Sequence, residues 1–183
     1  MRKVSREEVQ KPAEYAALRE AFRRAVLEQK DNRRIHVGSF LTFLFENHDT
    51  VLYQIQEMLR AENITSEPEI QHEMDTYNEL LGERGELGCT LLVEIDDPVK
   101  RSELLARWKD LPSTLYIETQ NGVRVAAQFD PRQVGEGRIS SVHYLKFRIG
   151  DQVPLKVGCS HPDIAAVSML TPDQIAALCR DLR

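Results

Sequence analysis

Three groups of residues have the types and spacing that metal or proton chemistry requires. The first is Glu69-Ile70-Gln71-His72, in which a carboxylate and an imidazole are three residues apart. On a helix they would share one face and could ligate iron or manganese, as in ferritin-like bundles. Such a bundle needs a second motif of this kind, and the sequence holds one. The alternative is that Glu69 belongs to a helix cap and His72 is solvated. Further carboxylates that could complete a site are Glu46, Glu57, Glu62 and Glu73.

The second group is the corner Glu46-Asn47-His48-Asp49, between an apolar run and a helical pattern. Loops between rigid elements often carry function, and a carboxylate, an amide and an imidazole together can bind a metal or transfer a proton. The simpler interpretation is that Asn47 or Asp49 caps the following helix while the other side chains are solvated.

The third group combines two strand patterns. Alternation places His143 on the more apolar face of its strand, with Leu145 and Phe147, and Glu94 interrupts another strand that looks buried. Both polar groups then need partners, so they could pair, share a metal ion or form separate structural hydrogen bonds. The strand pairing cannot be read from the sequence. The candidate ligands for iron, manganese or zinc are therefore Glu46, Glu57, His72, Glu73, Glu94 and His143.

The three cysteines, Cys89, Cys159 and Cys179, are widely spaced and form no Cys-x-x-Cys pair. This argues against a disulfide framework, a zinc knuckle and an iron–sulfur cluster. Cys159 precedes His161 by two residues, which leaves a catalytic thiol as a further alternative. The chain has no Gly-rich phosphate loop, no Gly-x-Ser-x-Gly elbow and no His-Glu-x-x-His, so no motif specifies a reaction.

The elements that position these residues differ between the two halves of the chain. Apolar residues recur at helical spacing from Arg6 to Gln29, and the spacing predicts one helix there. A second helix is expected from Asp49 to about Glu62, and a third from the capping box at Ser66 to Leu81. The run Ile35–Phe45 is ambiguous, and we favour a strand.

After Gly88, short β-branched and aliphatic runs alternate with turn signals such as Asn121-Gly122. The order predicts an α+β fold: one domain over 1–183, with a mainly helical part over 1–85 and a mostly antiparallel sheet with one or two flanking helices over 86–183. The expected strands are Cys89–Ile95, Thr114–Glu118, Val123–Phe129, Ile139–Ile149 and Val153–Val157, and the expected helices are Pro98–Lys109 and Thr171–Leu182.

Composition narrows the class of protein. The chain of 183 residues is 42% hydrophobic and 29% charged, as in an ordinary folded protein. The longest apolar run, Phe40–Phe45, is too short to cross a bilayer, and the N-terminus is charged, so we expect a cytoplasmic protein. The net charge is −5, although residues 1–36 hold ten basic and six acidic side chains. A nucleic-acid site on this arm lacks interleaved aromatic residues and is disfavoured. Its basic residues would be Arg2, Lys3, Arg23, Arg24, Arg33 and Arg34.

Several segments together resemble a bacterial family known as a domain of unknown function. They include Arg33-Arg34-Ile35 with Gly38, Phe45-Glu46-Asn47, Gln54-Ile55-Gln56-Glu57-Met58 and Ser141-Val142-His143-Tyr144-Leu145-Lys146-Phe147. The resemblance covers almost the whole chain and carries no catalytic residues with it. It implies a genomic context, because members are often encoded beside rubrerythrin-like proteins and iron–sulfur oxidoreductase subunits.

With this resemblance, we expect an accessory or interaction protein of a rubrerythrin-type redox or peroxide-defence system, without defined catalysis. A rubrerythrin-like or iron–sulfur protein would be its partner, and the N-terminal helices would form a homodimer. The alternative is a metal-dependent enzyme or non-haem iron protein that uses the Glu/His cluster.

Overall fold

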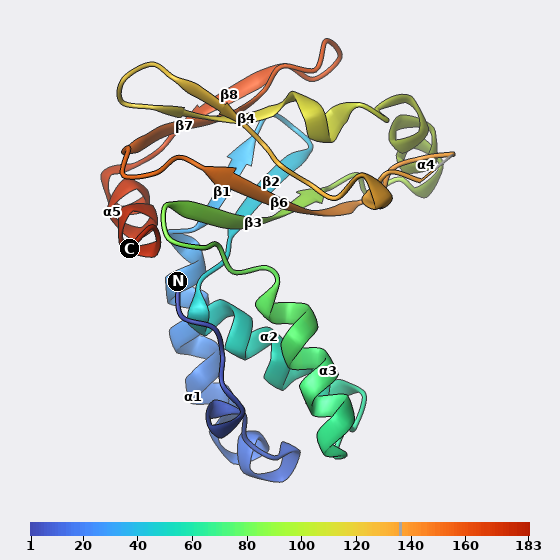
Figure 1. The fold of residues 1–183 in the computed structure, drawn as a ribbon. Coiled ribbons are helices and arrows are strands. Elements are labelled where there is room, and N and C mark those ends of the chain that lie inside the picture. Colours follow the sequence, from blue (N-terminus) through green and yellow to red (C-terminus); the bar gives the residue numbers. More distant parts are fainter. Residues whose placement is uncertain (136) are drawn as a thin grey trace.

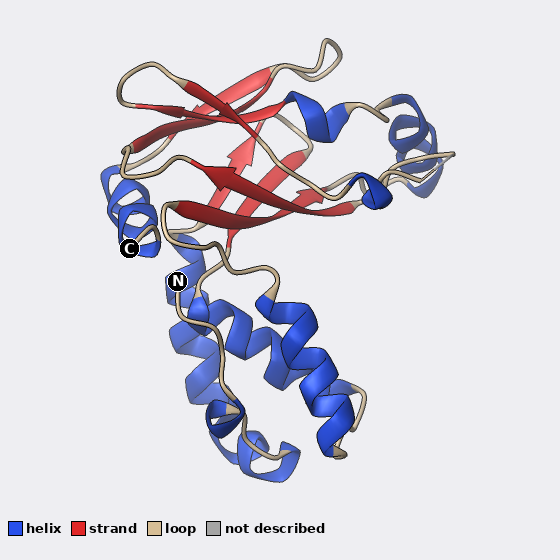
Figure 2. Ribbon diagram, viewed as in Figure 1, coloured by secondary structure: helices blue, strands red, loops and turns tan. Residues whose placement is uncertain are grey.

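The computed structural model describes residues 1–135 and 137–183, which form two lobes (Figure 1). The helical lobe consists of α1 (Pro12–Asp31), α2 (His48–Ala61), α3 (Glu67–Asn78) and the segment before α1. The sandwich consists of two sheets with α4 (Pro98–Arg107) and α5 (Pro172–Asp181). Figure 2 shows the three long helices projecting from one side of the sandwich. The expected α+β fold is confirmed.

Each sheet has four strands, and all neighbouring strands are antiparallel. The first sheet has the order β1-β2-β3-β6, with β1 (Arg34–Val37), β2 (Leu41–Phe45), β3 (Glu86–Val93) and β6 (Val142–Arg148). The second has the order β5-β4-β7-β8, with β5 (Arg124–Ala126), β4 (Leu115–Thr119), β7 (Pro154–Cys159) and β8 (Ala166–Met169). The β1–β2 hairpin thus belongs to the first sheet, although in the sequence it comes between α1 and α2 of the helical lobe.

The register of the first sheet decides which side chains face the second sheet. Ile35, Phe43, Leu91 and His143 are consecutive cross-strand partners, and all four are buried. Because side chains alternate along a strand, the neighbouring row of Leu44, Thr90 and Tyr144 points to the opposite face, where the helical lobe lies.

Two buried amide side chains hold the N-terminal segment to the helical lobe. Asn78 accepts from the backbone N–H of Val4 at 2.8 Å and donates to its carbonyl at 3.0 Å. Gln56 does the same with Gln10, at 2.6 and 3.1 Å. Each amide therefore completes the hydrogen bonding of one extended residue as a neighbouring strand would.

A buried ion pair connects the turn between α1 and β1 to α5, across the two lobes. The Arg33 guanidinium donates two hydrogen bonds to the Asp181 carboxylate, at 2.7 and 2.9 Å, and a third to the carbonyl of Gln29. The two side chains are 6% and 8% exposed. Because Arg33 is buried in this pair, it is not among the exposed basic residues that could bind a nucleic acid.

The expected helix from Arg6 to Gln29 is wrong at its start. The structure has a short 3₁₀ helix at Arg6–Glu8 and begins α1 at Pro12. Proline has no N–H to donate and a fixed φ, so it suits the first position of a helix. Val9 enters the core of the lobe instead of lying on a continuous helix, and Val4 of the preceding segment enters the same core.

The other boundaries differ from the expected ones by a few residues, and two helix caps and two strands depart from expectation in other ways. Asn47, rather than Asp49, caps α2, since its side chain accepts from Thr50 N–H at 2.9 Å. Ser66 is at the N-cap of α3, but its hydroxyl donates to Glu69 and caps no backbone N–H. The strand expected at Ile35–Phe45 is a hairpin, and β8 was not expected. Among the described residues, no helix is both long and apolar enough to cross a membrane.

Candidate functional site

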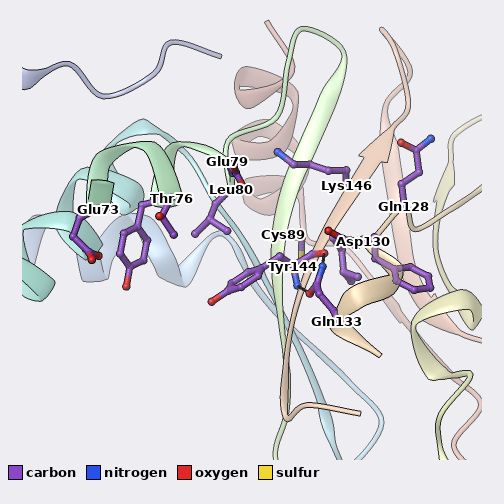
Figure 3. A pocket seen from close by; sticks show the side chains of 13 residues that line it. Glu73, Thr76, Glu79, Leu80, Cys89, Gln128, Asp130, Gln133, Tyr144 and Lys146 are labelled. Carbon is purple, nitrogen blue, oxygen red and sulfur yellow. Dashed lines mark hydrogen bonds between the residues drawn. The ribbon is translucent and has the colours of Figure 1, made fainter. Parts of the chain in front are cut away.

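A groove of about 490 Å³ lies between α3 and β6 and is here called the α3–β6 groove. Its walls are α3 and the loop that follows β5, and β6 runs along its base (Figure 3). The lining residues are Glu73, Thr76, Tyr77, Glu79, Leu80, Cys89, Gln128, Phe129, Asp130, Gln133, Tyr144, Leu145 and Lys146. This volume is in the range of small-molecule binding sites.

The groove has an apolar floor. Tyr77 and Phe129 are half-buried, Tyr144 is 48% exposed and Leu80 is buried beside them, whereas the buried side chains of Cys89 and Leu145 belong to the core between the sheets. Burial raises the pKa of the Cys89 thiol well above its usual range, which disfavours the reactive thiolate. The floor is therefore suited to apolar contact and not to nucleophilic attack.

Acidic and amide groups form the rim. Glu73 and Glu79 make no side-chain hydrogen bond or ion pair within residues 1–135 and 137–183, whereas Asp130 is paired with Arg132. The rim's lysine, Lys146, donates from Nζ to the Leu81 carbonyl and lies 4.0 Å from Glu86. Its pKa is lowered by burial. Lys146 and Arg132 interact electrostatically with Glu79 without forming an ion pair with it. Because Lys146 donates to the Leu81 carbonyl, the carboxylates that form no ion pair give the rim its negative charge.

The edge of β6 inside the groove is closed by a side chain. Gln133 accepts from the backbone N–H of Tyr144 at 2.7 Å and donates to its carbonyl at 3.1 Å (Figure 3). Two residues further along, Lys146 makes the corresponding pair of bonds, both 2.8 Å, with the backbone of Gln128. Gln133 thus occupies the place that the next residue of an adjacent strand would take.

The predicted metal ligands are distributed over both lobes. Glu46 is 1% exposed and accepts hydrogen bonds from the hydroxyls of Thr90 and Thr50, at 2.7 and 2.6 Å, and from the amide of Gln54. These donors supply the polar contacts that a buried carboxylate requires. Glu46 therefore secures the junction between β2 and α2.

Glu57 belongs to a separate cluster on α2. Arg19 binds both its carboxylate oxygens, at 2.7 and 2.8 Å, and the Tyr15 hydroxyl donates to it at 2.8 Å. The Arg19 guanidinium lowers the pKa of Glu57 to about 2, although partial burial opposes this shift. The carboxylate links α1 to α2.

The remaining candidates are also apart. His72 is exposed on α3, and Glu73 is at the rim of the groove. Glu94 is exposed, contrary to the expectation of burial, and accepts from the Thr42 hydroxyl. His143 faces the core between the sheets, so the two do not pair. Within 1–135 and 137–183, no three His, Cys, Asp or Glu side chains converge to hold a metal ion.

His143 is fully buried with one unsatisfied nitrogen. Its Nε2 lies 2.9 Å from the Ser140 carbonyl oxygen, so Nε2 carries the proton and Nδ1 a lone pair. Nδ1 has no hydrogen-bond partner among the described residues, and burial lowers the pKa of the ring. A neutral histidine in the sandwich core is the result.

The Cys159–His161 pair does not form a catalytic contact. The His161 imidazole lies 3.2 Å from Asp110 and accepts from the backbone N–H of Asp163. The buried Cys159 sulfur accepts from the backbone N–H of His161 and not from its ring. The corner histidine, His48, contacts Glu8 and Asp49.

Sequence reasoning did not find the groove. One signal was present, because alternation with the buried His143, Leu145 and Phe147 places Tyr144 and Lys146 on the outer face of their strand. Nothing local indicated that α3 lies opposite that face, since the contact depends on the strand order β1-β2-β3-β6.

Two comparisons place the chain among known proteins. Residues 3–182 match the family described as "Protein of unknown function (DUF3501)". A crystal structure of a novel protein of unknown function from Burkholderia pseudomallei K96243 is similar over 100% of both chains, with 28% identity and a TM-score of 0.91. No curated protein matches the chain. With a family match that spans nearly every residue and a neighbour of the same fold from end to end, the chain belongs to the DUF3501 family.

Proposed function

We propose that the protein is an accessory or interaction protein that receives a partner in the α3–β6 groove and performs no catalysis there. The observation that carries this proposal is the pairing of an apolar floor with a rim of unpaired carboxylates. Exposed apolar surface bordered by polar groups marks sites of protein interaction. Within the described residues, no groove thiol or hydroxyl contacts an imidazole or carboxylate that could activate it.

We further propose that the partner is a component of a rubrerythrin-type redox or peroxide-defence system. The support for this choice is the genomic context that the family resemblance implies. An acidic groove would favour a partner with basic side chains near an apolar anchor, because complementary charge accelerates association and aligns the two surfaces.

The test is binding to the purified rubrerythrin-type protein of the same host, measured by biolayer interferometry. Tyr144→Asp puts a charge at the centre of the groove on a side chain that is 48% exposed, so folding should be preserved. Met169→Asp is the matched control, since Met169 is 63% exposed on β8 of the other sheet. We expect Tyr144→Asp to weaken binding at least tenfold and Met169→Asp to leave it unchanged.

Two results would contradict the proposal. Equal affinity of both variants would remove the groove as the site. No association with the wild-type protein would remove the rubrerythrin-type partner. Thermal unfolding of each variant, followed by circular dichroism, distinguishes a lost surface from a lost fold.

A further inference from the structure

Three amide side chains among the described residues, those of Asn78, Gln56 and Gln133, each bind the backbone N–H and C=O of one residue far away in the chain. Asn78 and Gln56 are 8% and 2% exposed, and they fix the N-terminal segment inside the helical lobe. Gln133 makes the same pair of bonds to Tyr144, but at the open edge of a sheet and beside a groove. The first two amides are therefore structural, whereas the third covers a surface that another chain could reach.

A carboxamide and a peptide unit present the same donor and acceptor. Replacing the Gln133 amide by one residue of an incoming strand would leave the backbone groups of Tyr144 fully bonded. The next outward-facing N–H, that of Val142, is also bonded by a side chain, the Ser140 hydroxyl at 3.1 Å. Val142 and Tyr144 side chains are 37% and 48% exposed. Side chains thus bond the backbone edge of β6 at Val142 and Tyr144, whereas the backbone of Gln128 bonds it at Lys146.

The groove beside this edge also indicates the chemistry of the incoming segment. Alternate side chains of an added strand would point toward the apolar surface formed by Tyr77, Leu80 and Tyr144. Glu73 and Glu79 form no ion pair within the described residues, although Lys146 and Arg132 act on Glu79 electrostatically, so these rim carboxylates favour Lys or Arg on the segment. Along α3, acidic residues occupy the first turn and no basic residue occupies the last.

We infer that an extended, positively charged segment of a partner protein adds to β6 at Val142–Tyr144 in place of the Gln133 side chain, with apolar residues in the α3–β6 groove. This inference rests on the proposed function and specifies how the partner is recognised. An edge strand with unbonded backbone groups tends to pair with strands of other chains. In the free protein, Gln133 therefore also prevents unwanted pairing at the edge of β6.

The probe is a peptide selected from random twelve-residue peptides displayed on phage against the full-length protein. We expect the selected sequences to alternate apolar and basic residues. Binding of the best synthetic peptide is then measured by fluorescence anisotropy at two salt concentrations. We expect higher salt to weaken binding, since exposed charges are screened. Gln133→Ala should bind about five- to tenfold more tightly, because the competing side chain is gone.

Backbone N-methylation distinguishes an added strand from a docked helix. Only every second residue of an added strand donates to β6, so methylation in one register should abolish binding and methylation in the other should leave it intact. Equal effects in both registers, no gain from Gln133→Ala, or no enriched peptide would each overturn strand addition.

The variants also separate this inference from the proposed function. If Tyr144→Asp weakens peptide binding while both methylation registers behave alike, the groove binds its partner in another way. If Tyr144→Asp and the control Met169→Asp bind the peptide as well as the wild-type protein, the peptide does not use the groove and strand addition fails. The proposed function fails only if Tyr144→Asp also leaves the affinity for the rubrerythrin-type protein unchanged.

Discussion

The sandwich is held together by apolar contacts, whereas the helical lobe depends on buried polar groups as much as on its small core. Between the sheets, Phe147 packs against Phe43 and Phe45, with ring centroids 6.5 and 6.1 Å apart. The helical lobe has a smaller cluster around Ile55, and amides, ion pairs and caps join its segments. Polar contacts are directional, so a few hydrogen-bonded and ion pairs determine how the segments of the helical lobe are arranged. The arrangement of the sandwich depends instead on the volume and burial of its apolar side chains.

The first prediction concerns whether the two regions unfold together. Phe147→Ala should lower the free energy of unfolding by about 3–5 kcal/mol and destabilise the whole chain, because it empties the sandwich core. Ile55→Ala should cost about 2–5 kcal/mol and should expose the amides of the helical lobe selectively. Native-state hydrogen exchange measures both. Equal acceleration of sheet and helix amides in Ile55→Ala would show one cooperative unit.

The second prediction tests the ion pair between the regions. Arg33→Ala leaves the Asp181 carboxylate buried without its partner and should cost about 3–5 kcal/mol in urea unfolding. The double variant Arg33→Met with Asp181→Leu should recover most of that loss, since it removes both charges. A double variant as unstable as the single one would show that the hydrogen bond to Gln29 is what matters.

The third prediction concerns acid and the helical lobe. The pKa of Glu57 is lowered to about 2 in the folded protein, chiefly by Arg19. In the unfolded chain the pKa of a glutamate is about 4.3. Its contribution is therefore present above about pH 4.3 and is lost as the pH falls toward 2. The difference in unfolding free energy between wild type and Glu57→Gln should shrink over this range. A constant difference would refute the assignment.

The fourth prediction concerns acid and the sandwich. Burial lowers the pKa of His143 below the value of about 6.5 in the unfolded chain. The unfolded state therefore takes up a proton first, and stability is lost as the pH falls below that value. His143→Gln can still donate to the Ser140 carbonyl and does not titrate, so its unfolding free energy should vary less with pH between about 7 and 5. Parallel pH profiles would contradict this.

The fifth prediction has the smallest effect on stability. The homodimer expected through the N-terminal helices would use the exposed apolar residues of α1, Leu18 and Leu27, which are 52% and 39% exposed. Leu27→Glu should change the unfolding free energy of the monomer by no more than about 0.5 kcal/mol, yet should halve the mass in solution. Analytical ultracentrifugation measures that mass, and a wild-type monomer would end this proposal.

Local signals predicted the elements better than their arrangement. The Asn121-Gly122 turn identified the β4–β5 connection, and the helix expected at Thr171–Leu182 is α5, which the structure begins with a capping box at Thr171. Caps and tight turns depend on adjacent residues. β8 was missed, since Ala-Val-Ser-Met is short and has no strong pattern.

The candidate site was harder to predict. Burial was expected for Glu94 from its apolar neighbours, but it follows the end of β3 and lies exposed. His143 was placed on the apolar face by alternation, and the structure confirms that it is buried. The Gln133 contact joins a short 3₁₀ helix to an edge strand, and no spacing rule anticipates such long-range pairing.

The strand order also determines when each region can fold during synthesis. β6 completes the first sheet, but it follows β4 and β5 of the second sheet in the chain. A nascent chain that ends before β6 therefore has three strands of the first sheet with an uncovered apolar face and an unpaired edge. The segments of the helical lobe, by contrast, all precede β3. The helical lobe can form on the ribosome while the sandwich must wait, and this delay is when the protein most needs protection from aggregation.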